Sequence, residues 1–323
     1  MNDLADQLAA VLGEEGFDDS DKLESVRTIL YNRSRPATPE ESKAAWADLC
    51  RSAGIDPEAK TKPEPLPHIV SGPASHYYGS KYLLAPWILE HFPLHHCYVE
   101  PFGGAASVLL RKQPSPLEVY NDLEGSVVNF FSVLRDHTDD LLDRIAMTPW
   151  SRQEYLNAFA PTNHAVEWAR RFWVIHQQSI AATPCDVGWR CTTDQANRMP
   201  EFADRNRVLG NLRNIALRLR SIQIECRPAS EVIRRFDAPD TLFYVDPPYP
   251  HRTRTKTKRY LLECTDDQHR ELAQTLHQVT GKVIISGYRC DLYDDLYRNW
   301  RRVGKVARGN SGSRRTESLW LSF

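Results

Sequence analysis

A four-residue motif, Asp246-Pro247-Pro248-Tyr249, directly follows an apolar run at residues 241–245. The run has the character of a buried strand. A charged residue followed by two prolines cannot continue a central strand, because proline donates no backbone hydrogen bond. The motif therefore predicts a turn at the carboxyl end of a strand, where open α/β sheets bind their ligands.

The residues of this turn suit one kind of chemistry. An amino group conjugated to an aromatic ring is a poor nucleophile, because its lone pair is delocalised into the ring. A carboxylate that accepts one N–H and a carbonyl that accepts the other would draw the nitrogen towards a tetrahedral geometry. Asp246 supplies the carboxylate, Pro247 supplies the carbonyl, and the ring of Tyr249 offers a flat face for a base.

A second region with the pattern of a ligand-binding unit lies upstream, at residues 95–110. It predicts a strand, a turn at Gly103-Gly104 and then a helix, whose free N–H groups would face a ligand. A short strand at residues 117–120 follows and ends at Asn121-Asp122. Asp122 lies about twenty residues past the glycine turn, the spacing at which a carboxylate binds ribose hydroxyls.

These motifs resemble, in content and in order, those of the Dam-type or phage-type (D12 class) DNA adenine-N6 methyltransferases. The resemblance covers residues from about 76 to the end of the chain. The matching segments are Tyr77-Tyr78-Gly79-Ser80-Lys81, the loop at 100–106, Asn121-Asp122, Asp246–Tyr249, 281–288 and 316–321.

The resemblance implies S-adenosylmethionine as cofactor, S-adenosylhomocysteine as product and double-stranded DNA as substrate. Lys81 would lie near the methionine carboxylate, and Asp122 would hold the ribose. The turn at Asp246 would hold an adenine flipped out of the duplex. The implied cofactor-binding residues are Tyr77, Lys81, Glu100, Phe102, Gly104 and Asp122, and the implied catalytic residues are Asp246, Pro247, Pro248 and Tyr249.

Three positions depart from the family pattern. Ser80 replaces the second glycine of the first motif, which a turn tolerates if the backbone dihedral φ stays negative. Ala106 replaces the second glycine of the cofactor loop. Pro228 stands where relatives often carry an Asp near the adenine of the cofactor, which bears on cofactor affinity and not on the reaction.

The fold class expected is α/β: a Rossmann-like class I methyltransferase sheet with an inserted, mainly helical target-recognition domain and an N-terminal helical segment. The segment is residues 1–66, with a proline-rich linker to about 75. The catalytic domain is residues 76–146 and 222–323. The 124 residues between Asp122 and Asp246 exceed what a minimal sheet needs, which predicts the insertion at 147–221.

Local charge predicts contact with nucleic acid, although the net charge is only −1. A basic run directly follows the motif at Asp246, and basic loops beside an active site suit phosphate contacts. The insertion carries further arginines. The candidate DNA-binding residues are Arg190, Arg198, Arg252, Arg254, Lys256 and Lys258. The acidic balance of residues 1–66 weakly favours contact with a protein partner or self-association.

Other features limit the compartment and the cofactors. No apolar run reaches membrane-spanning length, so no membrane association is expected, and the acidic start does not resemble a signal peptide. Seven cysteines without repeated close pairing do not suggest a disulfide framework or a metal site. These features favour a reduced, cytoplasmic protein, and the resemblance implies a nucleoid-associated one of bacterial or phage origin.

Rival functions from the sequence are methylation of an RNA or of a cytosine amine, and a decayed site in a protein that only binds DNA. Cytosine enzymes usually carry Ser at the position of Asp246. RNA is harder to exclude, although the basic run and the large insertion favour DNA. The intact motif at Asp246–Tyr249 argues against decay.

Overall fold

The computed structural model of the chain describes residues 70, 72–75, 77, 79–180, 188–191, 205–253, 262–308 and 314–323. All of them belong to one compact unit, Leu66–Phe323. The N-terminal segment expected at residues 1–66 lies outside the described residues. In the part of the chain that is described, no helix is both long enough and apolar enough to cross a membrane.

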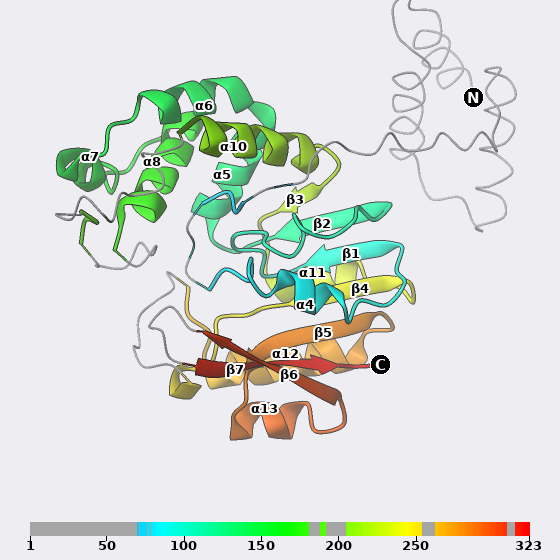
Figure 1. Cartoon of the computed structure of the whole chain (residues 1–323). Helices are drawn as coiled ribbons and strands as arrows, with labels where there is room; N and C mark the ends of the chain where they lie inside the picture. Colours follow the sequence, from blue (N-terminus) through cyan, green and yellow to red (C-terminus); the bar gives the residue numbers. More distant parts are fainter. Residues whose placement is uncertain are drawn as a thin grey trace, which may run out of the picture. The chain divides into compact units, whose positions relative to one another are not determined.

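A seven-stranded sheet forms the centre of this unit (Figure 1). Five neighbouring strands pair in parallel, and β7 pairs antiparallel with β5 and with β6. In spatial order the strands are β3 (Gln223–Glu225), β2 (Leu117–Asn121), β1 (Cys97–Glu100), β4 (Thr241–Val245), β5 (Lys282–Tyr288), β7 (Arg314–Leu321) and β6 (Arg301–Arg308).

The strand order reverses between β1 and β4, which lie side by side although they are far apart in sequence. Val99 of β1 pairs with Val119 on one side and with Phe243 on the other. The connections leave the sheet in opposite directions at this point, and a crevice therefore opens beyond the carboxyl ends of β1 and β4. The motif at Asp246 begins directly after β4, as the sequence predicts.

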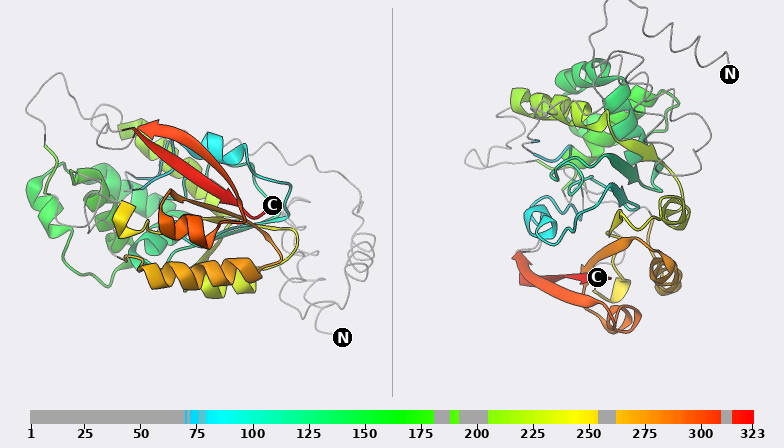
Figure 2. Two further views of the ribbon diagram at one scale, coloured as in Figure 1. Left: turned by 90° about the horizontal axis from the view of Figure 1, so that it is seen from below. Right: turned by 90° about the vertical axis from the view of Figure 1, so that its right-hand side faces the viewer.

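Both faces of the central strands are buried: every residue of β4 is buried, and those after Thr241 are apolar or aromatic. Leu242 and Tyr244 point into one core and Phe243 and Val245 into the other, with the period of two that a strand imposes. Figure 2 shows helices on both faces of the sheet. One core contains residues of α4 (Ala85–Leu89), and the other contains residues of α11 (Ala229–Arg235), α12 (Asp266–Gln278) and α13 (Asp291–Leu296).

Between β2 and β3 the described residues form a helical layer, gathered beside the β2–β3 end of the sheet (Figure 1). The first two helices pack against α8 and α10. The layer thus includes helices on both sides of residue 147, where the insertion is expected to begin. Its helices are α5 (Gly125–Asp136), α6 (Thr138–Met147), α7 (Arg152–Asn157), α8 (Ala165–Gln178) and α10 (Arg205–Leu219).

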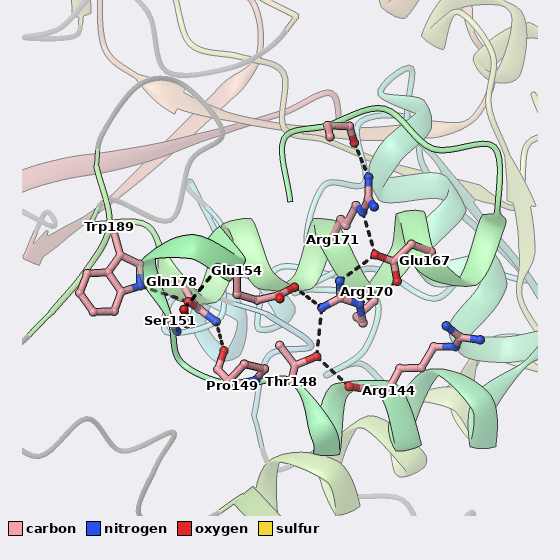
Figure 3. A network of polar contacts seen from close by, with 11 residues as sticks. Arg144, Thr148, Pro149, Ser151, Glu154, Glu167, Arg170, Arg171, Gln178 and Trp189 are labelled. Carbon is pink, nitrogen blue, oxygen red and sulfur yellow. Dashed lines mark hydrogen bonds and ion pairs between the residues drawn. The ribbon is translucent and has the colours of Figure 1, made fainter. Parts of the chain in front are cut away.

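Arg170 of α8 ties three of these helices together (Figure 3). Its guanidinium forms ion pairs with Glu154 at 2.6 Å and with Glu167 at 2.7 Å, and it donates a hydrogen bond to the Thr148 hydroxyl at 3.1 Å. Arg171 forms a second ion pair with Glu167 at 2.7 Å. These two arginines lower the pKa of Glu167 to about 2, against the smaller opposing effect of burial.

A buried charge triad joins the helical layer to the sheet. Glu118 of β2 forms ion pairs with Lys112 and with Arg218 in the last turn of α10, both at 2.5 Å. All three side chains are almost fully buried. Burial alone would raise the pKa of Glu118, but the two cations outweigh it and lower this pKa. The end of α10 is therefore fixed to the strand that leads to Asp122.

Candidate active site

A cavity of about 600 Å³ lies beyond the carboxyl ends of β1, β2 and β4. The two sequence regions singled out for ligand binding meet in it, because they end adjacent parallel strands. Helices α11 and α12 supply the opposite wall, which includes Ser230, Gln268 and Glu271. All six predicted cofactor-binding residues line the cavity, and Asp246 and Pro248 line it as well.

The glycine turn after β1 brings the backbone close to this cavity. The Gly103 amide donates to the Asn121 carbonyl at 2.7 Å, and the Gly104 amide donates to Asp122 Oδ2 at 2.8 Å. A Cβ on Gly103 would overlap the ring of Tyr120, whose hydroxyl donates to the Gly104 carbonyl at 2.8 Å. Gly104 has φ of +44°, which favours glycine. Both glycines are therefore required by the shape of the turn.

The helix expected after this turn does not form; residues 104–111 make a series of turns. Ala106 has φ of +52°, which interrupts a right-handed helix, and the Leu109 amide donates to the Glu100 carboxylate at 2.7 Å instead of to a carbonyl of its own segment. The backbone φ of Ser80 is not positive, so a serine fits in this turn where the family has its second glycine. The Leu109 amide thus bonds to the Glu100 carboxylate in place of the backbone carbonyl that a helix would offer.

Glu100 is buried at the end of β1 and faces the cavity. One of its oxygens, Oε1, accepts from the Tyr98 hydroxyl at 2.6 Å and from the Leu109 amide. Burial raises the pKa of Glu100 to about 8, and the negative charge of Asp246 contributes to the increase. At neutral pH this carboxyl is mostly protonated, so it adds little negative charge beside Asp246.

Asp122 and Tyr77 form the side of the cavity next to the helical layer. Asp122 accepts from the amides of Gly104 and Glu124, and burial raises its pKa. The Tyr77 hydroxyl donates to Glu124 at 3.3 Å, and its ring stacks on His176 of α8 with 5.2 Å between centroids. The amino-terminal motif and the glycine turn are therefore in contact through residues that also touch α5 and α8.

The segment that leads to Tyr77 is also held by the helical layer. The side-chain amide of Asn211 in α10 accepts from the Gly72 amide at 3.0 Å and donates to the Gly72 and Pro73 carbonyls at 3.0 and 3.2 Å. Asn211 is buried. One side chain thus satisfies three backbone groups of this segment, which fixes its path towards the cavity.

The carboxylate of Asp246 is engaged on both oxygens. Oδ2 forms an ion pair with Lys81 Nζ at 2.8 Å, and Oδ1 accepts from the Ser286 hydroxyl at 2.7 Å. Lys81 also donates to the Gly79 carbonyl. The resemblance implies that Lys81 lies near a cofactor carboxylate; the structure pairs it with Asp246, because a buried ammonium needs a nearby anion. No hydrogen bond among the described residues reaches the Pro247 carbonyl.

Tyr249 differs in position from the expected stacking platform. Its ring is buried, lies 4.8 Å from Lys81 Nζ and meets the Tyr288 ring edge-on at 5.0 Å. Its hydroxyl donates to Glu317 of β7. Tyr249 is not among the residues that line the cavity. In this structure its face is covered by the protein, so stacking on a base requires that Lys81 or the ring moves.

The candidate DNA-binding residues are divided by what the structure describes. Arg190 lies in the helical layer with its guanidinium 5.2 Å from the Trp150 ring, and Arg252 forms an ion pair with Asp266. Neither residue lines the cavity. Arg198, Arg254, Lys256 and Lys258 lie outside the described residues.

Sequence reasoning assigned no role to Ser286, Glu317 and Glu124. Ser286 and Glu317 lie within segments that carry the family resemblance, and this was the available signal. No sequence pattern indicated that Glu124, or Gln268 and Glu271 of α12, would line the cavity, because helix periodicity does not show which polar face will line a cavity.

A seven-stranded sheet in this order, with a cavity at the carboxyl ends of β1 and β4 and an acidic residue after β2, defines a Rossmann-like methyltransferase fold. A family model described as "D12 class N6 adenine-specific DNA methyltransferase" matches residues 77–308. The chain therefore belongs to this family.

A curated relative, the DNA adenine methylase of Serratia marcescens, is 33% identical to the chain over 64 residues. The match covers 20% of this chain and 23% of the relative. The match thus spans less than a quarter of the length of that enzyme.

Proposed function

We propose that the protein transfers a methyl group from S-adenosylmethionine to the N6 amine of an adenine in double-stranded DNA. The observation that carries the proposal is the position of the Asp246–Tyr249 turn directly after β4, where Asp246 and Pro248 line the 600 Å³ cavity. A carboxylate and a carbonyl on one turn present two adjacent acceptors, which matches the two hydrogens of an aromatic amine.

The cavity suits the proposed cofactor. Glycines 103 and 104 let the backbone approach a ligand where a Cβ would not fit, and Asp122 offers carboxylate lone pairs to ribose hydroxyls. We propose that Tyr77, Glu100 and Phe102 complete this subsite, with Ser230 of α11 at the end where relatives carry an acid. When bound, S-adenosylmethionine supplies a methyl group that is electrophilic because it is attached to a positively charged sulfur.

The amine is activated by the chain's own groups. Asp246 accepts one N–H and the Pro247 carbonyl accepts the other, which localises the nitrogen lone pair for an in-line attack. Positioning and stabilisation of the positive charge that develops on the nitrogen account for most of the expected rate. Lys81 pairs with Asp246 Oδ2 and lies over the Tyr249 ring, so a base that stacks on this ring must displace the lysine.

A base within a duplex is stacked and paired, so the adenine must be flipped out to reach Asp246. We propose that the helical layer acts as the target-recognition domain and contacts DNA through Arg190, together with Arg198. Arg252, Arg254, Lys256 and Lys258, which follow the catalytic turn, would contact phosphates. The ion pair between Arg252 and Asp266 would compete with such a contact.

The test is transfer of labelled methyl from S-adenosylmethionine to unmethylated duplex DNA, followed by digestion to nucleosides. We expect label in N6-methyladenine. Asp246→Ala should lower the rate at least about 100-fold, because removal of one group that stabilises transition-state charge costs this much, while cofactor affinity changes little. Label in methylcytosine, or transfer to RNA alone, would contradict the proposal, as would an active Asp246→Ala variant.

A further inference from the structure

Lys81 lies near two carboxylates, the partly exposed Asp246 and the buried Glu317. It pairs with Asp246, after β4, at 2.8 Å, and it lies 4.8 Å from the centre of the Tyr249 ring. The hydroxyl at the far end of that ring donates to Glu317 of β7. Glu317 is 4% exposed and pairs in register with Tyr288 at the catalytic edge of β5. Lys81 thus pairs with Asp246 and lies over a ring whose hydroxyl bonds to Glu317.

The resting arrangement leaves a problem for catalysis. Both oxygens of Asp246 are engaged, one by Lys81 and the other by Ser286. A base that stacks on Tyr249 needs the ring face that Lys81 covers, so Lys81, and not Ser286, is the group that must move. A buried ammonium that loses its anion costs several kcal/mol, so Lys81 leaves only if a second anion receives it.

We propose that Glu317 is a positioning residue that accepts the Lys81 ammonium from Asp246 when an adenine amine binds. This inference rests on the proposed function. The exchange moves an ion pair and no proton. It frees Asp246 Oδ2 for the amine and uncovers the face of Tyr249, which Lys81 occupies in the resting arrangement.

The surroundings of Glu317 agree with this role. Burial raises the pKa of Glu317, and the positive charge of Lys81 is the largest opposing effect. The Tyr249 hydroxyl donates to Glu317, which keeps the carboxylate oriented towards the ring and the lysine. A glutamate that served only to anchor Tyr249 would not need a charge, since a glutamine oxygen accepts the same hydrogen bond.

The decisive variant is Glu317→Gln, which keeps an acceptor for Tyr249 and removes the charge. We expect kcat for DNA methylation to fall about tenfold or more, the size of one hydrogen bond to a charged group, with the KM for S-adenosylmethionine unchanged. Glu317→Asp should recover part of the loss. Thr316→Val, on the same strand and exposed, should leave kcat unchanged.

A second measurement does not depend on methyl transfer. Once the methylated sequence is known, DNA affinity is compared for duplexes with adenine or with purine, which lacks the 6-amine, at the target position. S-adenosylhomocysteine is present throughout. The ratio of the two affinities should fall about tenfold in Glu317→Gln relative to the unaltered protein. The same duplexes are used for each variant, so differences in duplex stability cancel.

Lys81→Met removes the ammonium that Glu317 is proposed to receive. In that background Glu317→Gln should change neither the amine preference nor kcat by more than about twofold, because coupled residues give non-additive effects. An equal effect of Glu317→Gln with and without Lys81 would overturn the inference, and so would an undiminished amine preference in the single variant. If the unaltered protein methylates no adenine in DNA, the proposed function has failed instead.

Discussion

At the scale of single residues, the shape of the cofactor loop depends on the absence of a side chain at Gly103. Gly103 is covered by the Tyr120 ring, so a side chain there must displace a fully buried aromatic residue. Tyr120 in turn holds the Gly104 carbonyl through its hydroxyl. A larger residue at 103 therefore changes both the packing of β2 and the path of the loop that lines the cavity.

Gly103→Ala is expected to destabilise the protein by about 1–3 kcal/mol, the cost of overpacking a filled core, and to weaken S-adenosylmethionine binding. Gly210→Ala is the matched control, since a Cβ on Gly210 meets nothing within 4 Å. In the interior of helix α10 it should stabilise by about 0.5–1 kcal/mol. Urea denaturation of both variants checks this; equal effects would contradict the packing argument.

The raised pKa of Glu100 explains how this carboxyl can be buried close to Asp246. A buried carboxylate beside Asp246 would repel it, and the pKa of about 8 keeps Glu100 mostly neutral at physiological pH. As a neutral group it still receives the Tyr98 and Leu109 hydrogen bonds on Oε1. The loop is thereby anchored to β1 without a second full charge next to the proposed catalytic carboxylate.

At the scale of elements, two charge networks hold the helical layer. The triad of Lys112, Glu118 and Arg218 is buried and joins α10 to β2, whereas the network around Arg170 lies within the layer and is partly exposed. We expect the two networks to contribute differently to the free energy of unfolding, because a buried ion that loses its partner costs far more than an exposed one.

Glu118→Gln should lower the free energy of unfolding by about 3–5 kcal/mol, because it leaves Lys112 and Arg218 buried without a counter-charge. Asp140→Asn breaks an exposed i,i+4 pair with Arg144 and should cost less than about 1 kcal/mol. Denaturant midpoints for the two variants give the comparison. A small effect of Glu118→Gln would show that the triad adds no stability of this kind.

The Glu167 network predicts a pH dependence of stability. Its folded pKa of about 2 lies below the ordinary 4.5, so Glu167 stabilises the fold fully above about pH 4.5 and loses this contribution as pH falls towards 2. The contribution is on the order of 2 kcal/mol after allowance for solvent screening.

Unfolding free energies measured between pH 6 and pH 2.5 test this expectation. Glu167→Gln should flatten part of the acid decline seen with the unaltered chain. Glu231→Gln, whose pair with Arg227 is more than half exposed, serves as control and should keep the full slope. Identical profiles for all three proteins would rule out the role of Glu167.

At the scale of the whole molecule, the cavity joins distant parts of the chain. The helical layer touches it through Tyr77, which stacks on His176, and through the Asn211 clamp on residues 72–73. Strand β7 is linked to the catalytic turn through the hydrogen bond from Tyr249 to Glu317. A ligand in the cavity therefore contacts segments that the fold brings together, and its binding should stabilise the whole unit.

S-adenosylmethionine at about 100 times its Kd should raise the free energy of unfolding by about 2.7 kcal/mol, since it binds the folded state alone. Asp122→Asn should show a smaller gain at the same concentration. Asp240→Asn changes an exposed carboxylate before β4 and should show the full gain. Thermal melting with and without the cofactor measures all three; the absence of any shift would contradict the proposed cofactor.

Much of the fold follows from sequence pattern. The strands expected at 241–245 and 117–120 are present, and the described part of residues 147–221 is mainly helical as expected, because such segments have a period or an end signal of their own. The expected helix after Gly104 is absent for the opposite reason: the carboxylate of Glu100, at the end of the preceding strand, accepts the Leu109 amide in place of a helical carbonyl. Local pattern contains no information about that competition.

The sequence by itself determined the family, the sheet and the two strand-end motifs, because these depend on residue types at fixed spacings along one segment. Three contacts are visible only in the tertiary structure. Lys81 pairs with Asp246, Lys81 covers the face of the Tyr249 ring, and the Tyr249 hydroxyl donates to Glu317. These residues come from three segments separated by many tens of positions. Which buried charge neutralises which is settled by packing in three dimensions, since a desolvated ion takes whichever counter-charge the fold places within reach.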